Sequence, residues 1–153
     1  KNFTLISNLP YNISSKFLLK VIKFNKNITN IICMIQSELA DKFDYKKGKM
    51  NKYKFISKYC SDYDILFEVS PKVFYPKPKV YSKVVSFKLK KKNIDTKKLD
   101  YFIKFFFINK RKQIKSNKIF SSSINESNIH KRYEDLSYKD VLDIYERFNL
   151  PIS

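Results

Sequence analysis

One short segment of the sequence, Asn8-Leu9-Pro10-Tyr11, combines residue types that suit a particular chemistry. It directly follows the β-prone run Phe3 to Ser7, and in an open α/β sheet the segment after a strand faces the crevice where ligands bind. A carboxamide and a backbone carbonyl there can accept both N–H bonds of an exocyclic amine and aim its lone pair at an electrophile. An aromatic ring can hold a base turned out of its stack. The segment therefore favours methyl transfer to the amine of adenine.

Each residue of the segment has an expected role in that chemistry. Asn8 supplies the carboxamide oxygen, Leu9 or Pro10 supplies the carbonyl, and Tyr11 supplies the aromatic face. A sulfonium methyl donor carries the difficult chemistry, so neither a metal nor a nucleophilic side chain is needed. The same tetrapeptide is also an acceptable turn, since Asn tolerates unusual backbone angles and Pro is common in turns. On these four residues alone that alternative stays open.

Other catalytic groups are sparse. Cys33, Cys60 and His130 are far apart in the sequence and form neither a metal-ligand pattern nor a nucleophile with its base. Both cysteines stand in apolar stretches, so we expect buried, reduced thiols, which fit an intracellular compartment.

The first half of the sequence alternates between strand and helix patterns. Phe3 to Ser7 is a short strand, and Ser14 or Ser15 is expected to cap a helix that carries apolar residues at helical spacing. Ile28 to Ile35 is an apolar run, interrupted by Thr29 and Asn30, and such a run is typical of a buried parallel strand. Further expected elements are a helix over 38–43, a polar loop over 46–51 and a helix over 53–59.

Two more strand patterns follow, Asp64 to Val69 and Val80 to Leu89, and they flank the proline-rich segment 70–78. Strands joined by such an excursion suggest an antiparallel pair at a sheet edge. The order of elements indicates the second half of an α/β sheet whose tail turns antiparallel.

The composition changes at a lysine-rich hinge over 88–98, and from Thr96 onward the pattern is helical. Ser137 with Asp140 resembles a capping box at the start of a final helix. We therefore predict two domains: residues 1–92 form the α/β part and residues 93–153 form a small helical domain.

The net charge of +18 over 153 residues permits nucleic-acid binding, because lysine and arginine neutralise phosphates. Enrichment in lysine and asparagine, with Gly48 as the sole glycine, is also what an AT-rich genome imposes on any protein, so the charge alone decides nothing. No apolar run approaches the roughly 20 residues of a membrane span. The chain begins with Lys1 and at once enters a strand, so we expect it to be a piece of a longer protein.

Five blocks of the sequence resemble the ribosomal RNA adenine N6-dimethyltransferase family, in the family's order and over nearly the whole chain. The blocks are residues 5–15 (LISNLPYNISS), 34–40 (MIQSELA), 69–80 (VSPKVFYPKPKV), 106–117, which is similar to a basic helix, and 132–137 (RYEDLS). The resemblance implies the second half of a class I (Rossmann-like) methyltransferase sheet with an antiparallel edge, followed by a small all-helical domain. It implies S-adenosylmethionine as the cofactor.

The resemblance also implies roles for single residues. Asn8 contacts the cofactor and the target amine, Leu9 and Pro10 shape the acceptor carbonyl and the cofactor side of the turn, and Tyr11 and Phe74 sandwich the flipped adenine. A plain core position is the alternative for Phe74. The residues expected to grip RNA phosphates, each of which is otherwise a solvated surface charge, are Lys77, Lys79, Lys110, Arg111, Lys112, Lys115 and Lys118.

The sequence departs from the family pattern at three places. Tyr81 stands where the proline-rich block usually has an aspartate, and Tyr53-Lys54 stands in place of a Tyr-Gly pair. The family's glycine-rich cofactor turn is missing, since Gly48 lies in a lysine-rich loop. We expect the chain alone to bind S-adenosylmethionine weakly or not at all and to be inactive, since a complete enzyme would need the glycine-rich turn and an acidic residue for the cofactor ribose upstream of Lys1.

The favoured function is dimethylation of two adjacent adenines in small-subunit ribosomal RNA during ribosome biogenesis. An antibiotic-resistance methylase acting on large-subunit RNA is an alternative within the superfamily. A non-catalytic nucleic-acid binder, such as a ribosome-assembly or organellar transcription factor on the same fold, is another, and an unrelated basic α/β domain is a third. We expect an intracellular monomer in the bacterial cytoplasm or in an organelle, with the small ribosomal subunit as its partner and no membrane association.

Overall fold

The computed structural model describes residues 1–23, 27–108 and 112–150, which fall into two compact units. The first unit comprises residues 1–46 and 56–93, and the second comprises residues 47–55 and 94–153. The second unit thus takes in a segment that lies, in sequence, inside the predicted first domain. The domain ranges 1–92 and 93–153 stay predictions.

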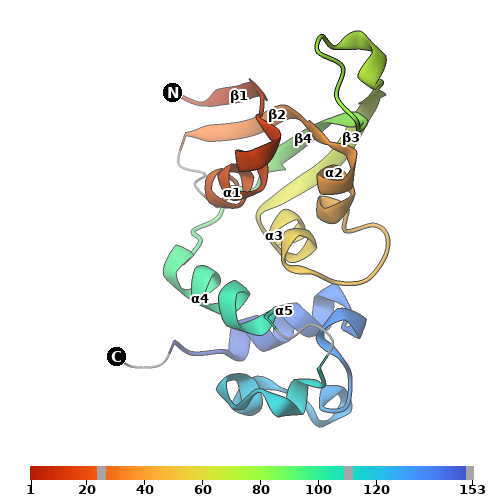
Figure 1. The fold of residues 1–153 in the computed structure, drawn as a ribbon. Coiled ribbons are helices and arrows are strands. Elements are labelled where there is room, and N and C mark those ends of the chain that lie inside the picture. The colour runs from red at the N-terminus through yellow and green to blue at the C-terminus, as the bar shows by residue number, and fades with distance from the viewer. Residues whose placement is uncertain (24–26, 109–111, 151–153) are drawn as a thin grey trace. The chain divides into compact units, whose positions relative to one another are not determined.

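Four strands of the first unit form one mixed sheet in the order β1-β2-β4-β3 (Figure 1). They are β1 (Phe3–Asn8), β2 (Ile28–Gln36), β3 (Ser61–Val69) and β4 (Ser82–Leu89). β1 and β2 are parallel, whereas β4 runs antiparallel to both β2 and β3. The predicted sheet with an antiparallel edge is therefore confirmed, and β3 is the strand at that edge.

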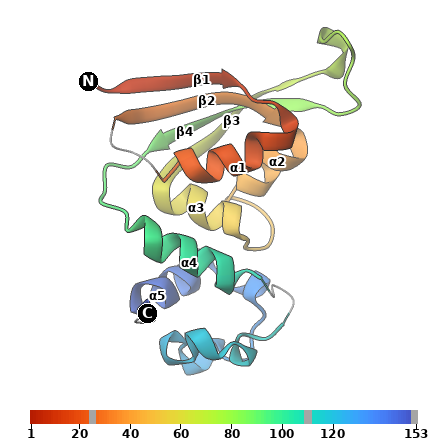
Figure 2. The ribbon, with the colours of Figure 1, turned by 60° about the vertical axis from the view of Figure 1, so that its left-hand side comes forward.

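Helices cover one face of this sheet. α1 (Tyr11–Val21) and α2 (Ser37–Phe43) follow β1 and β2 directly and lie on the same face (Figure 2). Phe43 of α2 meets the sheet through Phe87, with the ring centroids 5.2 Å apart, and Tyr63 packs against Phe87 at 4.9 Å. The Tyr63 hydroxyl donates to a backbone carbonyl of α2, that of Ala40, at 2.7 Å. These aromatic contacts fix α2 on the sheet because buried rings contribute large apolar areas.

The start of α1 differs from the prediction. The helix begins at Tyr11 after Pro10, and Ser14 is buried inside its first turns, so the expected cap at Ser14 or Ser15 is wrong. Pro10 has φ −56° and ψ 135°, and its carbonyl accepts the first backbone N–H groups of the helix. A proline before the first turn starts a helix without a side-chain cap because its φ is already fixed.

Between β3 and β4 the chain leaves the sheet as residues 70–81, here called the proline loop, which projects beyond the strand ends (Figures 1 and 2). It opens with a 3₁₀ turn, Pro71–Val73, and the Ser70 hydroxyl accepts the Lys72 N–H at 3.3 Å. The Tyr75–Pro76 peptide is cis.

The second unit is helical. α3 (Lys52–Cys60) begins in it, and α4 (Thr96–Phe106) and α5 (Tyr138–Arg147) lie wholly within it. Short 3₁₀ turns connect α4 and α5, namely Ile114–Ser116, Lys118–Ser123, Glu126–Asn128 and Tyr133–Asp135. The core is aromatic: Phe102 lies 4.6 Å from Phe106 and 5.3 Å from Phe120 between ring centroids. The predicted capping box of Ser137 and Asp140 is confirmed at the start of α5.

The expected basic helix over residues 106–117 is wrong for the residues that the structure describes. α4 ends at Phe106, and residues 112–117 contain only the 3₁₀ turn Ile114–Ser116. Gln113 forms an isolated antiparallel bridge with Arg132, and the Ile114 N–H donates to the Lys131 carbonyl at 3.1 Å. Long-range pairing therefore uses backbone groups that a continuous helix would need.

Candidate functional site

The carboxyl end of β1 positions the candidate segment. β1 pairs with β2 so that Asn8 lies opposite Met34, and both residues stand at the same edge of the parallel pair. Open α/β sheets bind ligands at this edge, because the connections there diverge and leave a crevice. The proline loop ends at the same edge, since Ser82 at the start of β4 pairs with Gln36 at the end of β2.

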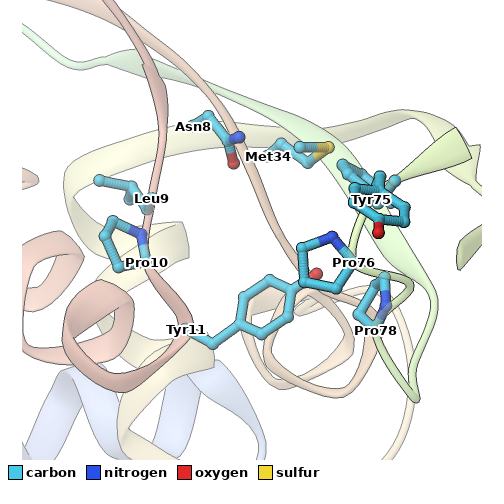
Figure 3. A pocket seen from close by; sticks show the side chains of 9 residues that line it. Asn8, Leu9, Pro10, Tyr11, Met34, Tyr75, Pro76 and Pro78 are labelled. Carbon is cyan, nitrogen blue, oxygen red and sulfur yellow. The ribbon is translucent and has the colours of Figure 1, made fainter.

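A pocket of about 320 Å³ lies at this edge (Figure 3). Its volume is at the lower end of the range for small-molecule sites. All five residues that the sequence proposes for the catalytic site line it, together with four that it does not propose. The lining residues are Asn8, Leu9, Pro10, Tyr11, Met34, Phe74, Tyr75, Pro76 and Pro78.

Backbone hydrogen bonds distinguish the two candidate carbonyls of the turn. The Pro10 carbonyl accepts the N–H groups of Ile13 at 3.2 Å and Ser14 at 3.1 Å, so both its lone pairs serve α1. The Leu9 N–H donates to the Met34 carbonyl at 3.3 Å, and the Leu9 side chain is 5% exposed. No described residue donates to the Leu9 carbonyl. The Leu9 carbonyl is thus held in place and can still accept a hydrogen bond, whereas the Pro10 carbonyl already accepts two.

Tyr11 is held by a long-range hydrogen bond. Its hydroxyl lies 2.8 Å from the hydroxyl of Ser82, which is fully buried at the start of β4. The Tyr11 ring is half-buried, as is the ring of Phe74 in the proline loop. The tyrosine at the start of α1 is therefore tied to the end of the proline loop, and two aromatic rings from separate segments line one pocket.

The side chain of Asn8 is exposed, and the described residues offer its amide no hydrogen-bond partner. An amide has two N–H donors and one carbonyl acceptor, so Asn8 has unused hydrogen-bonding capacity in the pocket. Figure 3 shows it above the opening, on the same side as Met34.

The sequence analysis did not propose four of the lining residues as site residues: Met34, Tyr75, Pro76 and Pro78. The strand pairing brings Met34 beside Asn8, and only the register shows this. Tyr75 is fully exposed at the pocket. Its position directly after Phe74 is the sequence signal that could have indicated it as a lining residue.

The described residues among those proposed to grip RNA belong to both units. Lys77 and Lys79 are exposed on the proline loop. Lys112, Lys115 and Lys118 are exposed in the second unit, and Lys110 and Arg111 lie outside the described residues.

Both cysteines are free and buried, as predicted. Desolvation raises the pKa of Cys33 to about 12, and it also raises that of Cys60 to about 12. Neither thiol is activated as a nucleophile, since reactivity requires the thiolate. Across residues 1–23, 27–108 and 112–150 no cluster of potential metal ligands forms, and no helix is long and apolar enough to cross a bilayer.

Two solved structures share this fold. A dimethyladenosine transferase from Plasmodium falciparum superimposes with a TM-score of 0.76 at 20% identity, covering 94% of this chain and 66% of that one. The 23S rRNA methyltransferase ErmE superimposes with a TM-score of 0.69 at 15% identity, covering 98% of this chain and 66% of that one. The α/β fold, with its crevice at the carboxyl end of β1, is that of the methyltransferases.

The particular family follows from the sequence. The model of the family described as ribosomal RNA adenine dimethylase matches residues 1–150, and the chain belongs to this family. The resemblance stated from the five blocks is confirmed.

Curated relatives carry the name ribosomal RNA small subunit methyltransferase A. The protein of Mycoplasmopsis synoviae is 34% identical over 95% of this chain and 57% of its own length. That of Malacoplasma penetrans is 40% identical over 75% of this chain and 43% of its own length. That of Thermotoga maritima is 33% identical over 94% of this chain and 52% of its own length. The chain spans about half the length of the curated relatives it matches.

Proposed function

We propose that this chain supplies the adenine-binding half of an S-adenosylmethionine-dependent methyltransferase that dimethylates two adjacent adenines of small-subunit ribosomal RNA. The observation that carries the proposal is the pocket at the end of β1, where Asn8, Leu9, Tyr11 and Phe74 meet. Family membership and the names of the relatives support the same reaction. Because the chain spans about half of those relatives, the activity is proposed for the longer protein that carries it.

The geometry favours one arrangement of the target amine. The amine of adenine is a weak nucleophile because its lone pair is delocalised into the ring. The Asn8 amide oxygen accepts one of its N–H bonds, and the Leu9 carbonyl accepts the other, since the Pro10 carbonyl is already used by α1. Two acceptors in fixed positions hold the amine with its lone pair directed out of the ring plane. After transfer the methylated amine carries a positive charge and is strongly acidic, so it gives up its proton to water, because the Asn8 and Leu9 oxygens are too weakly basic to keep it.

The adenine ring is proposed to lie between Tyr11 and Phe74. Base–aromatic stacking contributes about 1–3 kcal/mol per base by alanine substitution, which offsets the cost of unstacking the target. The hydrogen bond between the Tyr11 and Ser82 hydroxyls limits rotation of the Tyr11 ring, so less entropy is lost when the base enters.

The residues present fit one side of a cofactor site. Asn8 and Pro10 are exposed at the carboxyl end of β1, and the Asn8 amide has no partner among the described residues. When bound, S-adenosylmethionine supplies an electrophilic methyl group on sulfur. Asn8 would hold it through its N–H donors while its oxygen faces the amine, and Pro10 would border it with an apolar ring. Met34 also lines the pocket, and its apolar side chain would help to exclude water there.

Exposed lysines on the proline loop and in the second unit are proposed to contact ribosomal RNA phosphates. Each such contact releases counterions, so the affinity should fall steeply with salt. The three relatives named ribosomal RNA small subunit methyltransferase A come from bacteria, and that name refers to the small ribosomal subunit. We therefore propose that the protein acts where small subunits are assembled, in the bacterial cytoplasm or in an organelle.

The test is methyl transfer from labelled S-adenosylmethionine to small ribosomal subunits that lack the modification. The proteins compared are the 153-residue chain, the longest protein that its gene encodes, and that longer protein with Asn8→Ala. Asn12→Ala is the matched control, because Asn12 is an exposed asparagine of α1 that does not line the pocket.

We expect the longer protein to label two adjacent adenines. Asn8→Ala should lower the rate about 100-fold or more, since misplacing the reacting group alone costs about that much. Asn12→Ala should be as active as the unaltered protein. Equal rates with Asn8→Ala would refute the mechanism. No transfer at all, with salt-sensitive RNA binding retained, would refute the enzymatic function.

A further inference from the structure

A second groove, here called the flanking groove, lies on the proline loop beside the adenine pocket. It has a volume of about 470 Å³, and Pro78 lines both hollows. Its lining residues are Ser70, Pro71, Lys72, Lys77, Pro78, Lys79 and Tyr81. A ligand that fills the adenine pocket therefore has this groove as its direct neighbour.

Tyr81 offers an aromatic face on a fixed backbone. Its carbonyl accepts the N–H of Ser37, the first residue of α2, at 3.0 Å. The next residue, Ser82, is buried and lies 2.8 Å from the Tyr11 hydroxyl. Yet Tyr81 itself is 50% exposed. The backbone of Tyr81 is thus coupled to the adenine pocket, while its ring stays available to a ligand.

The groove is positively charged. Lys72, Lys77 and Lys79 are all exposed, and none is paired with a carboxylate in the part of the chain that the structure describes. No acidic residue lines the groove. Tyr81 adds an aromatic ring to this lining. Unpaired lysines around an aromatic face match the chemistry of a nucleotide, which has a phosphate and a flat base.

We propose that the flanking groove binds the nucleotide next to the target adenine, with its base stacked on Tyr81 and its phosphates held by Lys72, Lys77 and Lys79. This inference rests on the proposed function and adds a second nucleotide subsite to it. Binding the neighbour keeps the strand unstacked on both sides of Pro78. With both subsites occupied, the protein recognises two consecutive nucleotides rather than one.

The test measures binding, which needs no methyl transfer. The 153-residue chain is titrated against fluorescein-labelled eight-nucleotide RNAs with two central adenines. Two further RNAs carry an abasic ribose on the 5′ or the 3′ side of one adenine. The protein variants are Tyr81→Ala, Tyr81→Phe and the triple variant Lys72→Gln, Lys77→Gln, Lys79→Gln. A triple variant of exposed lysines elsewhere in the same unit controls for charge: Lys16→Gln, Lys20→Gln, Lys88→Gln.

We expect Tyr81→Ala to weaken binding of the intact RNA about 10-fold and Tyr81→Phe to leave it unchanged, since stacking needs only the ring. The loss should disappear with one of the two abasic RNAs, because that RNA has no base to stack. The groove triple variant should reduce the magnitude of the negative slope of log K against log salt by about 2, at about 0.7 for each of the three lysine–phosphate contacts with a single strand. The control triple variant should lower it less.

The other outcomes are distinguishable. If Tyr11→Ala and Phe74→Ala weaken binding but no groove variant does, the flanking subsite is refuted and the adenine pocket stands. If Tyr81→Ala weakens binding of intact and both abasic RNAs equally, the base does not stack on Tyr81 and the proposal is wrong. If neither set of variants affects binding, both the subsite and the adenine pocket are refuted. Circular dichroism of each variant checks that it is folded.

Discussion

The hydrogen bond between Tyr11 and Ser82 gives an asymmetric prediction for stability. The Ser82 hydroxyl is fully buried, whereas the Tyr11 ring is half-buried at the pocket. Tyr11→Phe therefore leaves a buried hydroxyl without a partner, which costs about 1–3 kcal/mol. Ser82→Ala leaves the hydroxyl of a half-buried tyrosine that lines the pocket, and we expect water to replace the lost partner, so only the net hydrogen bond is lost, about 0.5–1.5 kcal/mol. The double variant should cost less than the sum, because it removes both partners together.

The assay is urea unfolding of the chain, monitored by circular dichroism. The change in the free energy of unfolding is taken from the shift of the urea midpoint, provided that the slope of the free energy against urea concentration is the same for all variants. Tyr75→Phe is the matched control, because the Tyr75 side chain is fully exposed in the same pocket. We expect its midpoint to match that of the unaltered chain. An additive double variant, or a Tyr11→Phe variant as stable as the unaltered chain, would show that the hydrogen bond does not hold the ring.

The further predictions concern the two cysteines and Asp140. Burial raises the pKa of Cys33 and Cys60 to about 12 each, so above pH 9 the unfolded state loses protons that the folded state keeps, and stability should fall as the pH rises from about 9 to 12. Iodoacetamide at pH 8 should label both thiols far more slowly in the native chain than in urea, and equal rates would contradict their burial. At the start of α5, burial works to raise the pKa of Asp140, but hydrogen bonds from Ser137 and Asn128 and the charge of Lys131 outweigh it, and the pKa is lowered. Stability gained from Asp140 should therefore be lost as the pH falls through its lowered pKa, and Ser137→Ala should cost about 1 kcal/mol at pH 7, measured by urea unfolding.

Much of the fold could be predicted because the relevant patterns are local. The β-branched run of β2, the apolar spacing of α4 and the capping box of Ser137 and Asp140 each act within one element. The side-chain periods of 2 and 3.6 residues make such elements visible in the sequence. The segment Asn8 to Tyr11 was visible for the same reason, since a strand followed by Pro and an aromatic residue is a local signal.

Where local signals compete, the sequence misleads. Ser14 is a good capping residue, but Pro10 lies four residues earlier and starts α1 first. The basic residues after α4 suggest a helix, but Gln113 and Ile114 pair with a segment near residue 132, and no local pattern announces that pairing.

The sequence by itself determined the order of the elements, the family and the five residues proposed around the adenine pocket. Only the tertiary structure decided how that pocket is completed: Met34 joins it through the parallel register, and Ser82, 71 residues from Tyr11, holds the tyrosine ring. The tertiary structure also shows that the Pro10 carbonyl is used by α1 and the Leu9 carbonyl is not, and it places Tyr81 beside unpaired lysines. The physical reason is that propensity and periodicity act within a few residues, whereas register, burial and hydrogen-bond partners are set by segments that meet only when the chain folds.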